Sequence, residues 1–282
     1  MKRNKNFNSP DNLLYLVATP IGNLQEVSPR TISILEQADV IAAEDTRNTG
    51  SLLNKLGIKN KELFSLREHN ENEASKHVIE LIKAGKKVAY VSDAGYPGIS
   101  DPGYLLVKNA LKENINVSTI SGPSAFLNAL VASGLETNHF YFHGFLSAKE
   151  TEAKKELEEL KNKKETLIFY ESPHRIGKTL NLMNDILGNR DAVIARELTK
   201  INEEYIRGTL DELSNIDEST LIGEMVIIVS GNKEEIKINE EEIILRVGYY
   251  LKRGYSKKDA TQMVSEELEI PKNFVKKLII KE

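Results

Sequence analysis

The first half of the chain alternates between short apolar runs and segments in which apolar residues recur at helical spacing. These strand patterns lie at 13–18, 39–43, 62–66, 88–91 and 116–120, and those at 13–18 and 88–91 are continuous apolar runs. Continuous apolar runs of this length are typical of strands that are buried on both faces. Strands that alternate with helices pair in parallel, because each helix carries the chain back across the sheet. The alternation over roughly 110 residues therefore predicts a mostly parallel sheet that is covered by helices on both faces.

The second half contains further strand patterns at 139–145, 166–170, 192–195, 204–208 and 225–229, and helical patterns at 148–164 and from 172 onward. Residues 231–242 are polar and charged, which indicates a linker, and three short helical patterns follow them. We therefore expect an α/β protein of two domains with a small helical appendage. The expected parts are a polar N-terminal segment (1–12), an N-terminal α/β domain (13–134), a C-terminal α/β domain (135–231), and a linker with a basic helical tail (232–282).

Polar residues just ahead of helical patterns predict where three of the helices begin. Ser28 precedes Pro29, which suits the first position of a helix. Asn70 with Glu73, and Ser256 with Asp259, have the spacing of capping boxes.

Composition excludes several classes of site. The chain has no cysteine, so it has no disulfide, thiolate metal site or cysteine nucleophile. Its five histidines show no pair at metal-ligand spacing, and we expect no structural metal. The first 12 residues lack an apolar core, and no apolar run approaches the roughly 18 residues of a membrane span. These features predict a cytoplasmic protein without a signal peptide.

One loop, between Val91 and Gly103, is unusually rich in residues that favour turns. It contains three glycines, two prolines, two serines and two aspartates. Glycine permits positive φ angles and a close approach of the backbone to a ligand. In an open α/β sheet, ligands bind beyond the carboxyl ends of the strands. The loop therefore predicts a binding site, with a long turn that binds nothing as the alternative.

Three other loops also follow predicted strands, at 19–23, 121–124 and 196–200. Together with 92–103 they can form one crevice that offers backbone groups and small hydroxyls to a compact polar ligand. None of them is a GxGxxG or Walker loop, which disfavours a dinucleotide or a nucleoside triphosphate.

Seven motifs in this order carry a resemblance to a known family. They are Leu16–Leu24 (LVATPIGNL), Ala43–Arg47 (AEDTR), His69–Glu71 (HNE), Val91–Gly103 (VSDAGYPGISDPG), Ser121–Ala125 (SGPSA), Phe169–Ile176 (FYESPHRI) and Arg196–Lys200 (RELTK). Residues from about Leu14 to Gly231 resemble the 16S rRNA cytidine 2′-O-methyltransferases, a branch of the tetrapyrrole methylase superfamily. The resemblance implies the two-domain, class III methyltransferase fold and a homodimer. It also implies S-adenosylmethionine (SAM) between the domains, no metal, and a decoding-region cytidine of 16S rRNA, within the small ribosomal subunit, as substrate.

The same resemblance implies which residues line the SAM crevice: Pro20, Gly22, Ser92, Asp93, Gly95, Gly98, Ile99, Ser121 and Gly122. The alternative for Asp93 is a purely structural role, in which its side chain stabilises the turn that contains it. Glu224 lies either near the adenine or at an exposed strand edge. The superfamily usually has a glycine-rich first loop and a Gly-Asp-Pro after the fourth strand. This chain has Thr19–Asn23 and Ser92–Gly95 there, which argues against a porphyrin substrate.

Methyl transfer to a ribose hydroxyl needs a group that helps to remove a proton from a weakly acidic alcohol. Lys200, Glu197 and Asp45 are the candidates for this base, with His69 as a weaker fourth. Each could instead be an ordinary ion-pair partner.

RNA phosphates suit the forked guanidinium of arginine, so Arg47 and Arg175 are candidates to contact them. Arg175 could equally be a capping or surface residue. The tail, residues 249–282, has eight basic and five acidic residues, whereas the whole chain has a net charge of −4. It is expected to form a helical unit, resembling a helix-turn-helix, whose Lys257, Lys258, Lys276 and Lys277 bind RNA. The alternative is a helical unit that only docks on the catalytic domains.

Two other functions compete with an RNA methyltransferase. One is a methyltransferase that acts on a tetrapyrrole or another small molecule, and the other is a SAM-binding module that docks on RNA without catalysis.

Overall fold

The computed structural model describes residues 12–233, 240–268 and 270–280. The predicted polar segment 1–12 lies, except for Asn12, outside the described residues. Residues up to 232 form one compact unit and the remainder a second.

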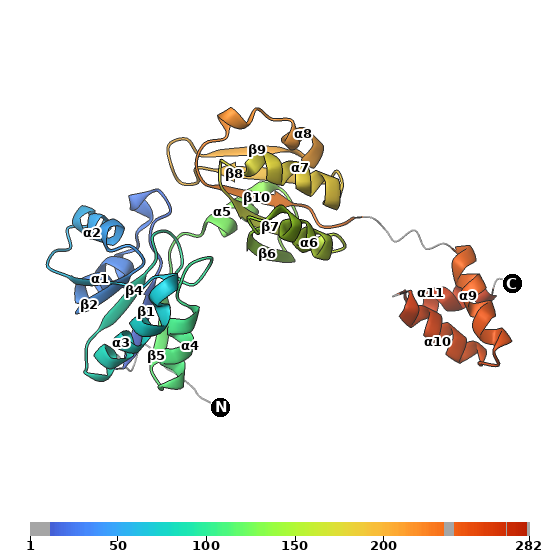
Figure 1. Cartoon of the computed structure of the whole chain (residues 1–282), viewed down its shortest axis with the longest axis horizontal. Coiled ribbons are helices and arrows are strands. Elements are labelled where there is room, and N and C mark those ends of the chain that lie inside the picture. Colours follow the sequence, from blue (N-terminus) through green and yellow to red (C-terminus); the bar gives the residue numbers. More distant parts are fainter. Residues whose placement is uncertain (1–11, 234–239, 269, 281–282) are drawn as a thin grey trace. The chain divides into compact units, whose positions relative to one another are not determined.

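The first sheet is wholly parallel, as the alternating pattern predicts (Figure 1). Its strands stand in the order β3-β2-β4-β1-β5. Every neighbouring pair is parallel. The strands are β1 (Leu13–Val17), β2 (Val40–Ala43), β3 (Glu62–Ser65), β4 (Val88–Val91) and β5 (Asn116–Ile120).

Helices cover both faces of this sheet. They are α1 (Pro29–Gln37), α2 (Thr46–Lys55), α3 (Glu71–Lys83) and α4 (Tyr104–Lys112). On β4, Val88 and Tyr90 pack in a cluster with residues of α3 and α4, while Ala89 and Val91 pack in another cluster with residues of α1 and α2. Successive side chains of a strand point to opposite faces, so a strand covered on both sides must be apolar throughout. This explains the unbroken apolar runs.

The second sheet is mixed, with the strand order β6-β7-β10-β8-β9. Only β6 and β7 pair in parallel; the other pairs are antiparallel. The strands are β6 (Phe140–Phe145), β7 (Thr166–Glu171), β8 (Asp191–Arg196), β9 (Glu204–Thr209) and β10 (Met225–Val229). One face packs against α6 (Glu150–Leu160), α7 (Ile176–Leu187) and the short α8 (Leu210–Ser214), which the sequence pattern did not predict.

The other face of the second sheet is covered by α5 (Ala125–Ser133), which precedes it in the sequence. Ala129 and Leu130 of α5 pack in one cluster with Ile168, Val193 and Val226. The helix therefore belongs to the core of the second sheet although it lies before residue 134. The domain boundary at 134/135 stays a prediction.

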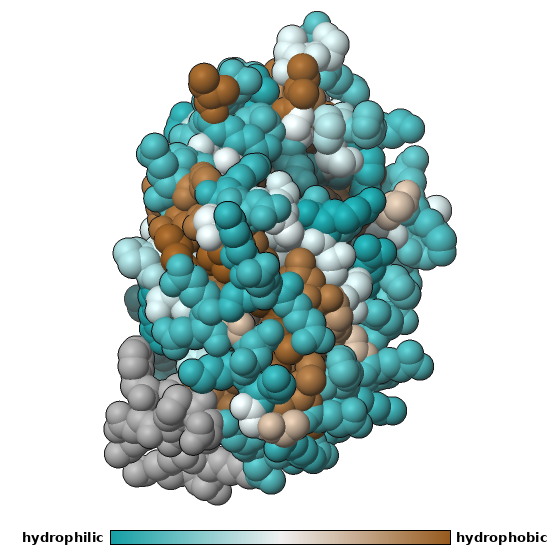
Figure 2. Space-filling model, turned by 90° about the vertical axis from the view of Figure 1, so that its left-hand side faces the viewer, coloured by the Kyte–Doolittle hydropathy of each residue, from teal (hydrophilic) through white to brown (hydrophobic). Residues whose placement is uncertain are grey.

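Residues 240–280 contain the three helices that the tail pattern predicts, α9 (Glu240–Lys252), α10 (Lys257–Glu267) and α11 (Lys272–Ile280). They share a small core that includes Val247, Ala260, Val264 and Val275. Among the described helices, none is both long and apolar enough to cross a membrane. On the face drawn in Figure 2, hydrophilic residues cover most of the surface.

All three predicted helix starts are confirmed, since α1, α3 and α10 begin directly after Ser28, Asn70 and Ser256. The Ser28 hydroxyl accepts a hydrogen bond from the Thr31 N–H, and the Ser256 hydroxyl accepts one from the Asp259 N–H. The capping box of Asn70 and Glu73 is wrong. The Asn70 amide instead bridges the N–H of Arg67 (2.7 Å) and the carbonyl of Ser65 (3.1 Å). Its side chain is therefore used ahead of the helix rather than to cap it.

The residue that organises this part of the fold is Glu71, at the start of α3. Its side chain is buried, and its Oε1 accepts hydrogen bonds from the N–H groups of Gly103 (2.8 Å), Leu105 (2.9 Å) and Leu106 (3.3 Å). The first N–H groups of a helix have no partner within it, and a carboxylate there also matches the helix dipole. Glu71 thus caps α4 from a distant position in the sequence.

We expect Glu71→Ala to lower the free energy of unfolding by about 2 kcal/mol, because buried donors lose their acceptor. Urea denaturation of the two proteins measures the change. Glu73→Ala, which removes an exposed carboxylate from the same helix turn, should change stability by less than about 0.5 kcal/mol. Equal losses in both variants would contradict the capping role of Glu71.

Candidate active site

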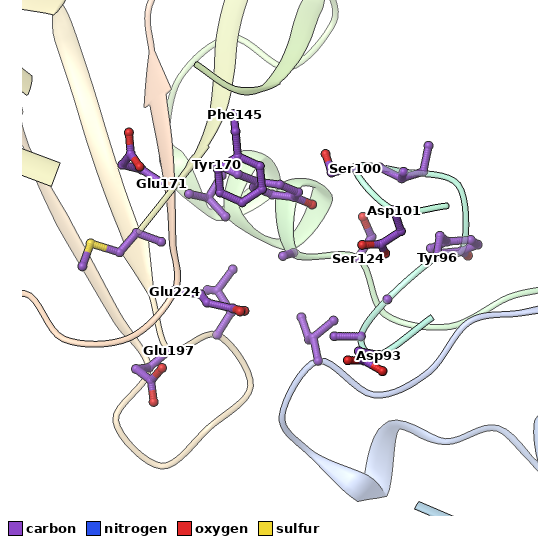
Figure 3. Close-up of a pocket in the computed structure, with 18 of the residues that line it drawn as sticks. Asp93, Tyr96, Ser100, Asp101, Ser124, Phe145, Tyr170, Glu171, Glu197 and Glu224 are labelled. Carbon is purple, nitrogen blue, oxygen red and sulfur yellow. The ribbon is translucent and has the colours of Figure 1, made fainter. Parts of the chain in front are cut away.

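A cavity of about 330 Å³ lies among the loops that follow the strands of both sheets (Figure 3). On one side it is lined by the loop after β4, with Asp93, Tyr96 and Asp101, together with Ile21 and Glu44. The opposite side comes from the second sheet and its loops: Tyr170, Glu171, Glu197, Leu198, Lys200, Glu224, Met225 and Val226. The cavity thus has the position that the sequence predicts for a crevice.

The lining of this cavity is strongly acidic. Six carboxyl groups reach it, against the one ammonium group of Lys200; they are Glu44, Asp93, Asp101, Glu171, Glu197 and Glu224. Figure 3 shows Glu171, Glu197 and Glu224 on one side and Asp93 and Asp101 on the other. Such a lining favours a cationic ligand and repels phosphate. Apolar groups, among them Ile99, Phe145 and Val226, complete the wall.

The loops of the first sheet hold one another in place. Thr19 and Gly95 exchange two backbone hydrogen bonds (2.9 and 3.1 Å), and the buried Thr19 hydroxyl donates to the carbonyl of Ser92 (3.1 Å). Gly95 has φ +72°, a conformation that favours glycine. The Gly122 N–H donates to the hydroxyl of Tyr96 (3.2 Å). The cavity wall is therefore built from bonded loops.

Close packing, rather than an open surface, explains two of the predicted glycines. A Cβ atom at Gly22 would lie 2.5 Å from Cγ of Lys200, and one at Gly122 would lie 2.8 Å from Cβ of Ala18. The neighbouring Asn23 N–H donates to the hydroxyl of Thr199 (3.1 Å). Gly22 therefore lets the loop after β1 touch the loop after β8.

Backbone strain is concentrated in the loops of this cavity. Apart from three asparagines, the described residues other than glycine with positive φ are Ser100 (+59°), Glu197 (+50°) and Thr199 (+66°). Ser100 and Glu197 line the cavity, and Thr199 lies between two lining residues. Such conformations cost free energy and gather at functional sites. Their location supports a functional role for both loops.

A second cavity, of about 560 Å³, adjoins the first. It shares Glu44, Asp93, Ser100 and Asp101 with the first cavity. Its other lining residues are Asp45, Arg67, Glu68, His69, Glu71 and Pro102. The loop that follows β4 thus forms the boundary between two spaces.

The carboxyl groups near this boundary differ in acidity. Hydrogen bonds from Arg47 hold the pKa of the Asp45 carboxyl well below its usual range. Burial raises the pKa of the Glu44 carboxyl. Burial, followed by the charge of Glu44, raises the pKa of Asp101 to about 7. Asp45 is therefore a weak base, whereas Asp101 exchanges protons near neutral pH.

The predicted cofactor residues divide into two groups. Asp93, Gly95 and Ile99 line the first cavity. Six others lie outside its lining: Pro20, Gly22, Ser92, Gly98, Ser121 and Gly122. Asp93 does not close its own turn, since its two oxygens accept from the N–H of Asp45 (3.2 Å) and the amide of Asn48 (2.8 Å). The cofactor roles themselves stay predictions.

Of the candidate bases, Lys200 and Glu197 line the first cavity and form an ion pair of 2.8 Å. Asp45 and His69 line only the second cavity. Asp45 is paired with Arg47 at 2.5 Å. The structure therefore brings together two of the four candidate bases, Lys200 and Glu197. They form an ion pair, which is the alternative role that the sequence analysis left open for each candidate.

The candidate RNA contacts have different surroundings. The Arg47 side chain is 84% exposed despite its pair with Asp45. The guanidinium of Arg175 donates to the carbonyls of Leu146 (2.9 Å) and Ser147 (3.2 Å) and lies 3.5 Å from Glu171, so it holds the loop after β6. Lys257, Lys258, Lys276 and Lys277 are exposed on α10 and α11.

Sequence reasoning did not assign roles to several lining residues, among them Glu44, Tyr96, Asp101, Phe145, Tyr170 and Glu171. These residues lie at strand ends, within the seven family motifs or next to them, and this position is the signal in the sequence that marks them. Glu171 is itself structural, because Oε2 accepts from the Thr179 hydroxyl (2.6 Å) and Oε1 from the Ser172 N–H (2.8 Å). Among the described residues, no group of three or more His, Cys, Asp and Glu is arranged to hold a metal.

Comparisons with known proteins agree with this architecture. Residues 13–214 match the model of the tetrapyrrole (corrin/porphyrin) methylases. The chain is 46% identical to the ribosomal RNA small subunit methyltransferase I of Halalkalibacterium halodurans, over 98% of each chain. It is 41% identical to the protein of that name from Bacillus subtilis, over 98% of this chain and 97% of the relative.

A solved structure shows the same fold at low sequence identity. The X-ray structure of cobalt precorrin-4 methyltransferase, a cobalamin biosynthetic enzyme, has a TM-score of 0.57 and 18% identity. The match covers 78% of this chain and 95% of the other. The matched family model and the full-length relatives lead to one conclusion: the chain belongs to the tetrapyrrole methylase family.

Proposed function

We propose that this protein methylates small-subunit ribosomal RNA, with SAM as methyl donor and the ribose 2′-hydroxyl of the decoding-region cytidine 1402 in 16S rRNA as acceptor. The observation that carries the proposal is the similarity over 98% of the chain to relatives that are named ribosomal RNA small subunit methyltransferase I. Because that similarity includes the helical tail, it is more specific than the shared methylase domain. An enzyme with this substrate works in the cytoplasm, within or near the small ribosomal subunit.

The first cavity has the chemistry that SAM requires. Its carboxylates favour the positive charges of the sulfonium and amino groups, and its apolar wall suits an adenine ring. When bound, SAM supplies a methyl group activated by the sulfonium charge. Gly95, at the bridge to Thr19, allows the backbone to approach such a ligand closely.

Two alternatives make different demands on the chain. A methyltransferase for a tetrapyrrole needs no basic helical tail, and a docking module without catalysis needs no proton-accepting group in its cavity. The exposed lysines of α10 and α11 favour an RNA-modifying enzyme over the first alternative, and the carboxyl groups of the cavity favour it over the second.

Mass spectrometry of rRNA nucleosides from cells with and without this gene tests the function. We expect 2′-O-methylcytidine at the target position to disappear without the gene and to return with the wild-type copy. Labelled SAM with purified subunits tests catalysis directly. An unchanged nucleoside profile would contradict the proposal.

We assign Lys200 and Glu197 to the chemical step. A lysine paired with a carboxylate at 2.8 Å serves better as a charge than as a proton acceptor. Its ammonium group stabilises the negative charge that develops on the 2′-oxygen as its proton leaves. Glu197 positions Lys200, and Asp45 positions Arg47 beside the second cavity.

We expect Lys200→Met to lower kcat by at least about 10²-fold while the Kd for SAM hardly changes. Methionine keeps the side-chain stem that packs beside Gly22 and removes only the charge. Steady-state kinetics and isothermal titration measure the two quantities. Lys112→Met, on the exposed part of α4, is the control and should behave as wild type. A loss of SAM affinity with kcat preserved would assign Lys200 to cofactor binding.

The helical tail is proposed to bind rRNA phosphates through Lys257, Lys258, Lys276 and Lys277. These side chains are exposed on helices whose apolar faces share a separate core. Lysine charges attract the phosphate backbone and make binding dependent on salt. We propose that Arg47 adds a phosphate contact beside the second cavity, and that Arg175 contributes another.

A protein that ends at Asn232 should bind SAM with unchanged affinity and bind rRNA more weakly, with a flatter salt dependence. The reason is that residues up to 232 form one compact unit, whereas the segment 249–282, with eight basic and five acidic residues, lies beyond it. Isothermal titration with SAM and filter binding of rRNA at several salt concentrations measure these effects. Unchanged RNA affinity and slope would show that the tail does not contact RNA.

We propose that the protein is a homodimer that uses an apolar patch on α5 and β6. The patch consists of Leu127, Val131 and Phe140, which are 43%, 72% and 41% exposed. Phe126 links the two elements through a ring contact with Phe140. Exposed apolar patches commonly mark protein–protein contacts.

Val131→Glu should convert the dimer to a monomer, because a charge would be buried at the interface without a partner. Size-exclusion chromatography with light scattering measures the mass. Leu111→Glu, at a 45% exposed position of α4, is the matched control and should stay dimeric. A monomeric wild-type protein at micromolar concentration would contradict the proposal.

A further inference from the structure

The two cavities meet at the loop after β4. Glu44, Asp93, Ser100 and Asp101 are the residues that line both. If the first cavity holds the methyl donor, as the proposed function requires, the second is the adjoining space for the acceptor ribose. The proton of the attacking hydroxyl then leaves at the shared boundary, and a base must lie there.

Hydrogen bonds already occupy two of the three shared carboxylates. Both oxygens of Asp93 accept from the start of α2. Oε2 of Glu44 accepts from the N–H of Asp93 at 3.1 Å. Within the described part of the chain, the Asp101 carboxylate has no ion pair and no hydrogen bond within 3.5 Å, since the neighbouring Ser92 hydroxyl donates to the carbonyl of Ala94 (3.4 Å). Asp101 is therefore the shared carboxylate with the most free acceptor capacity.

The backbone on both sides of Asp101 is anchored. The preceding Ser100 has φ +59°. The carbonyl of the following residue, Pro102, accepts from the hydroxyl of the buried Tyr90 at 2.9 Å. The N–H of Gly103 donates to Glu71 at 2.8 Å. A carboxylate on such a held segment is fixed in position, as catalysis requires.

We infer that Asp101 is the general base of the methyl transfer. The O–H bond of the ribose breaks and its proton passes to the Asp101 carboxylate. The 2′-oxygen forms a bond to the methyl carbon, and the electron pair of the broken carbon–sulfur bond stays on sulfur. Atoms and charge balance without a metal or a second reactant. Lys200, on the opposite wall, stabilises the oxygen charge and does not take the proton.

The groups that face Asp101 come from several elements. Glu44 follows β2, Asp93 lies in the same loop, and Glu224 precedes β10; all three raise its pKa, after burial, while the Ser92 hydroxyl lowers it. The positively charged side chains that line the two cavities are Lys200 and Arg67, and the imidazole of His69 also lines the second cavity. A base works only when deprotonated, so with a pKa of about 7 the rate should increase as the pH rises through 7.

Asp101→Asn preserves the shape of the side chain and removes the proton acceptor. We expect kcat to fall by about 10²–10⁴-fold, while the Kd values for SAM and rRNA stay within about twofold of wild type. The residual activity should lose the rise through pH 7. Lys200→Met should also be slow but should keep that rise. Asp211→Asn, at an exposed position on α8, is the control and should match wild type in every measurement.

A measurement without turnover completes the test. Carboxyl NMR of the protein without RNA should show an acid that titrates near pH 7 in wild type and not in Asp101→Asn. An active variant that keeps the pH dependence would overturn the inference. So would a variant that loses SAM affinity but keeps kcat. If the wild-type protein leaves rRNA unmethylated, the proposed function itself is wrong. The assignment of Asp101 as the general base, which rests on that function, is then wrong as well.

Discussion

The buried carboxylate of Glu71 supports the part of the structure on which the rest of the site depends. It accepts three backbone N–H groups at the start of α4 and so fixes the end of the loop that follows β4. The hydroxyl of Tyr90 holds the same segment through Pro102. The loop thus leaves β4 and enters α4 at anchored points. The polar side chains between them, Asp93 and Asp101 among them, are presented to the cavities in one arrangement.

Electrostatics divide the work between two parts of the chain. The cavity gathers carboxylates, which attract a sulfonium donor but repel an RNA backbone. Positive charge is concentrated instead in the tail, although the chain as a whole has a net charge of −4. An enzyme that must bind both a cationic donor and a polyanion gains from this separation, because the acidic cavities suit the donor while the basic tail suits the RNA backbone. Arg47, which is exposed and paired with Asp45 of the second cavity, is the proposed phosphate contact on the catalytic unit.

The loops of the cavity combine restraint with strain. Glycines at 22 and 122 permit contacts that a Cβ atom would block, and Ser100, Glu197 and Thr199 adopt positive φ angles without being glycine. Such features cost stability unless the surrounding structure compensates for them. Here the compensation comes from the bonds between the loops after β1, β4 and β8. Loops that are fixed in this way can hold a donor and an acceptor in line.

The sequence by itself determined the elements of the first sheet, their parallel pairing and the loops that form the crevice. Apolar runs form strands and glycine- or proline-rich segments form turns for reasons that lie within each segment. The seven motifs are sufficient to indicate the family. It did not determine that α5 packs on the second sheet, that Asn70 leaves its helix uncapped, or that Glu71 caps α4 from 32 residues away. It also did not show that Asp45 is tied to Arg47, that Lys200 is paired with Glu197, or that Asp101 lies where two cavities meet. The pKa of a carboxyl group and the identity of its ion-pair partner depend on burial and on charges that come together from distant segments. Only the tertiary structure decides both.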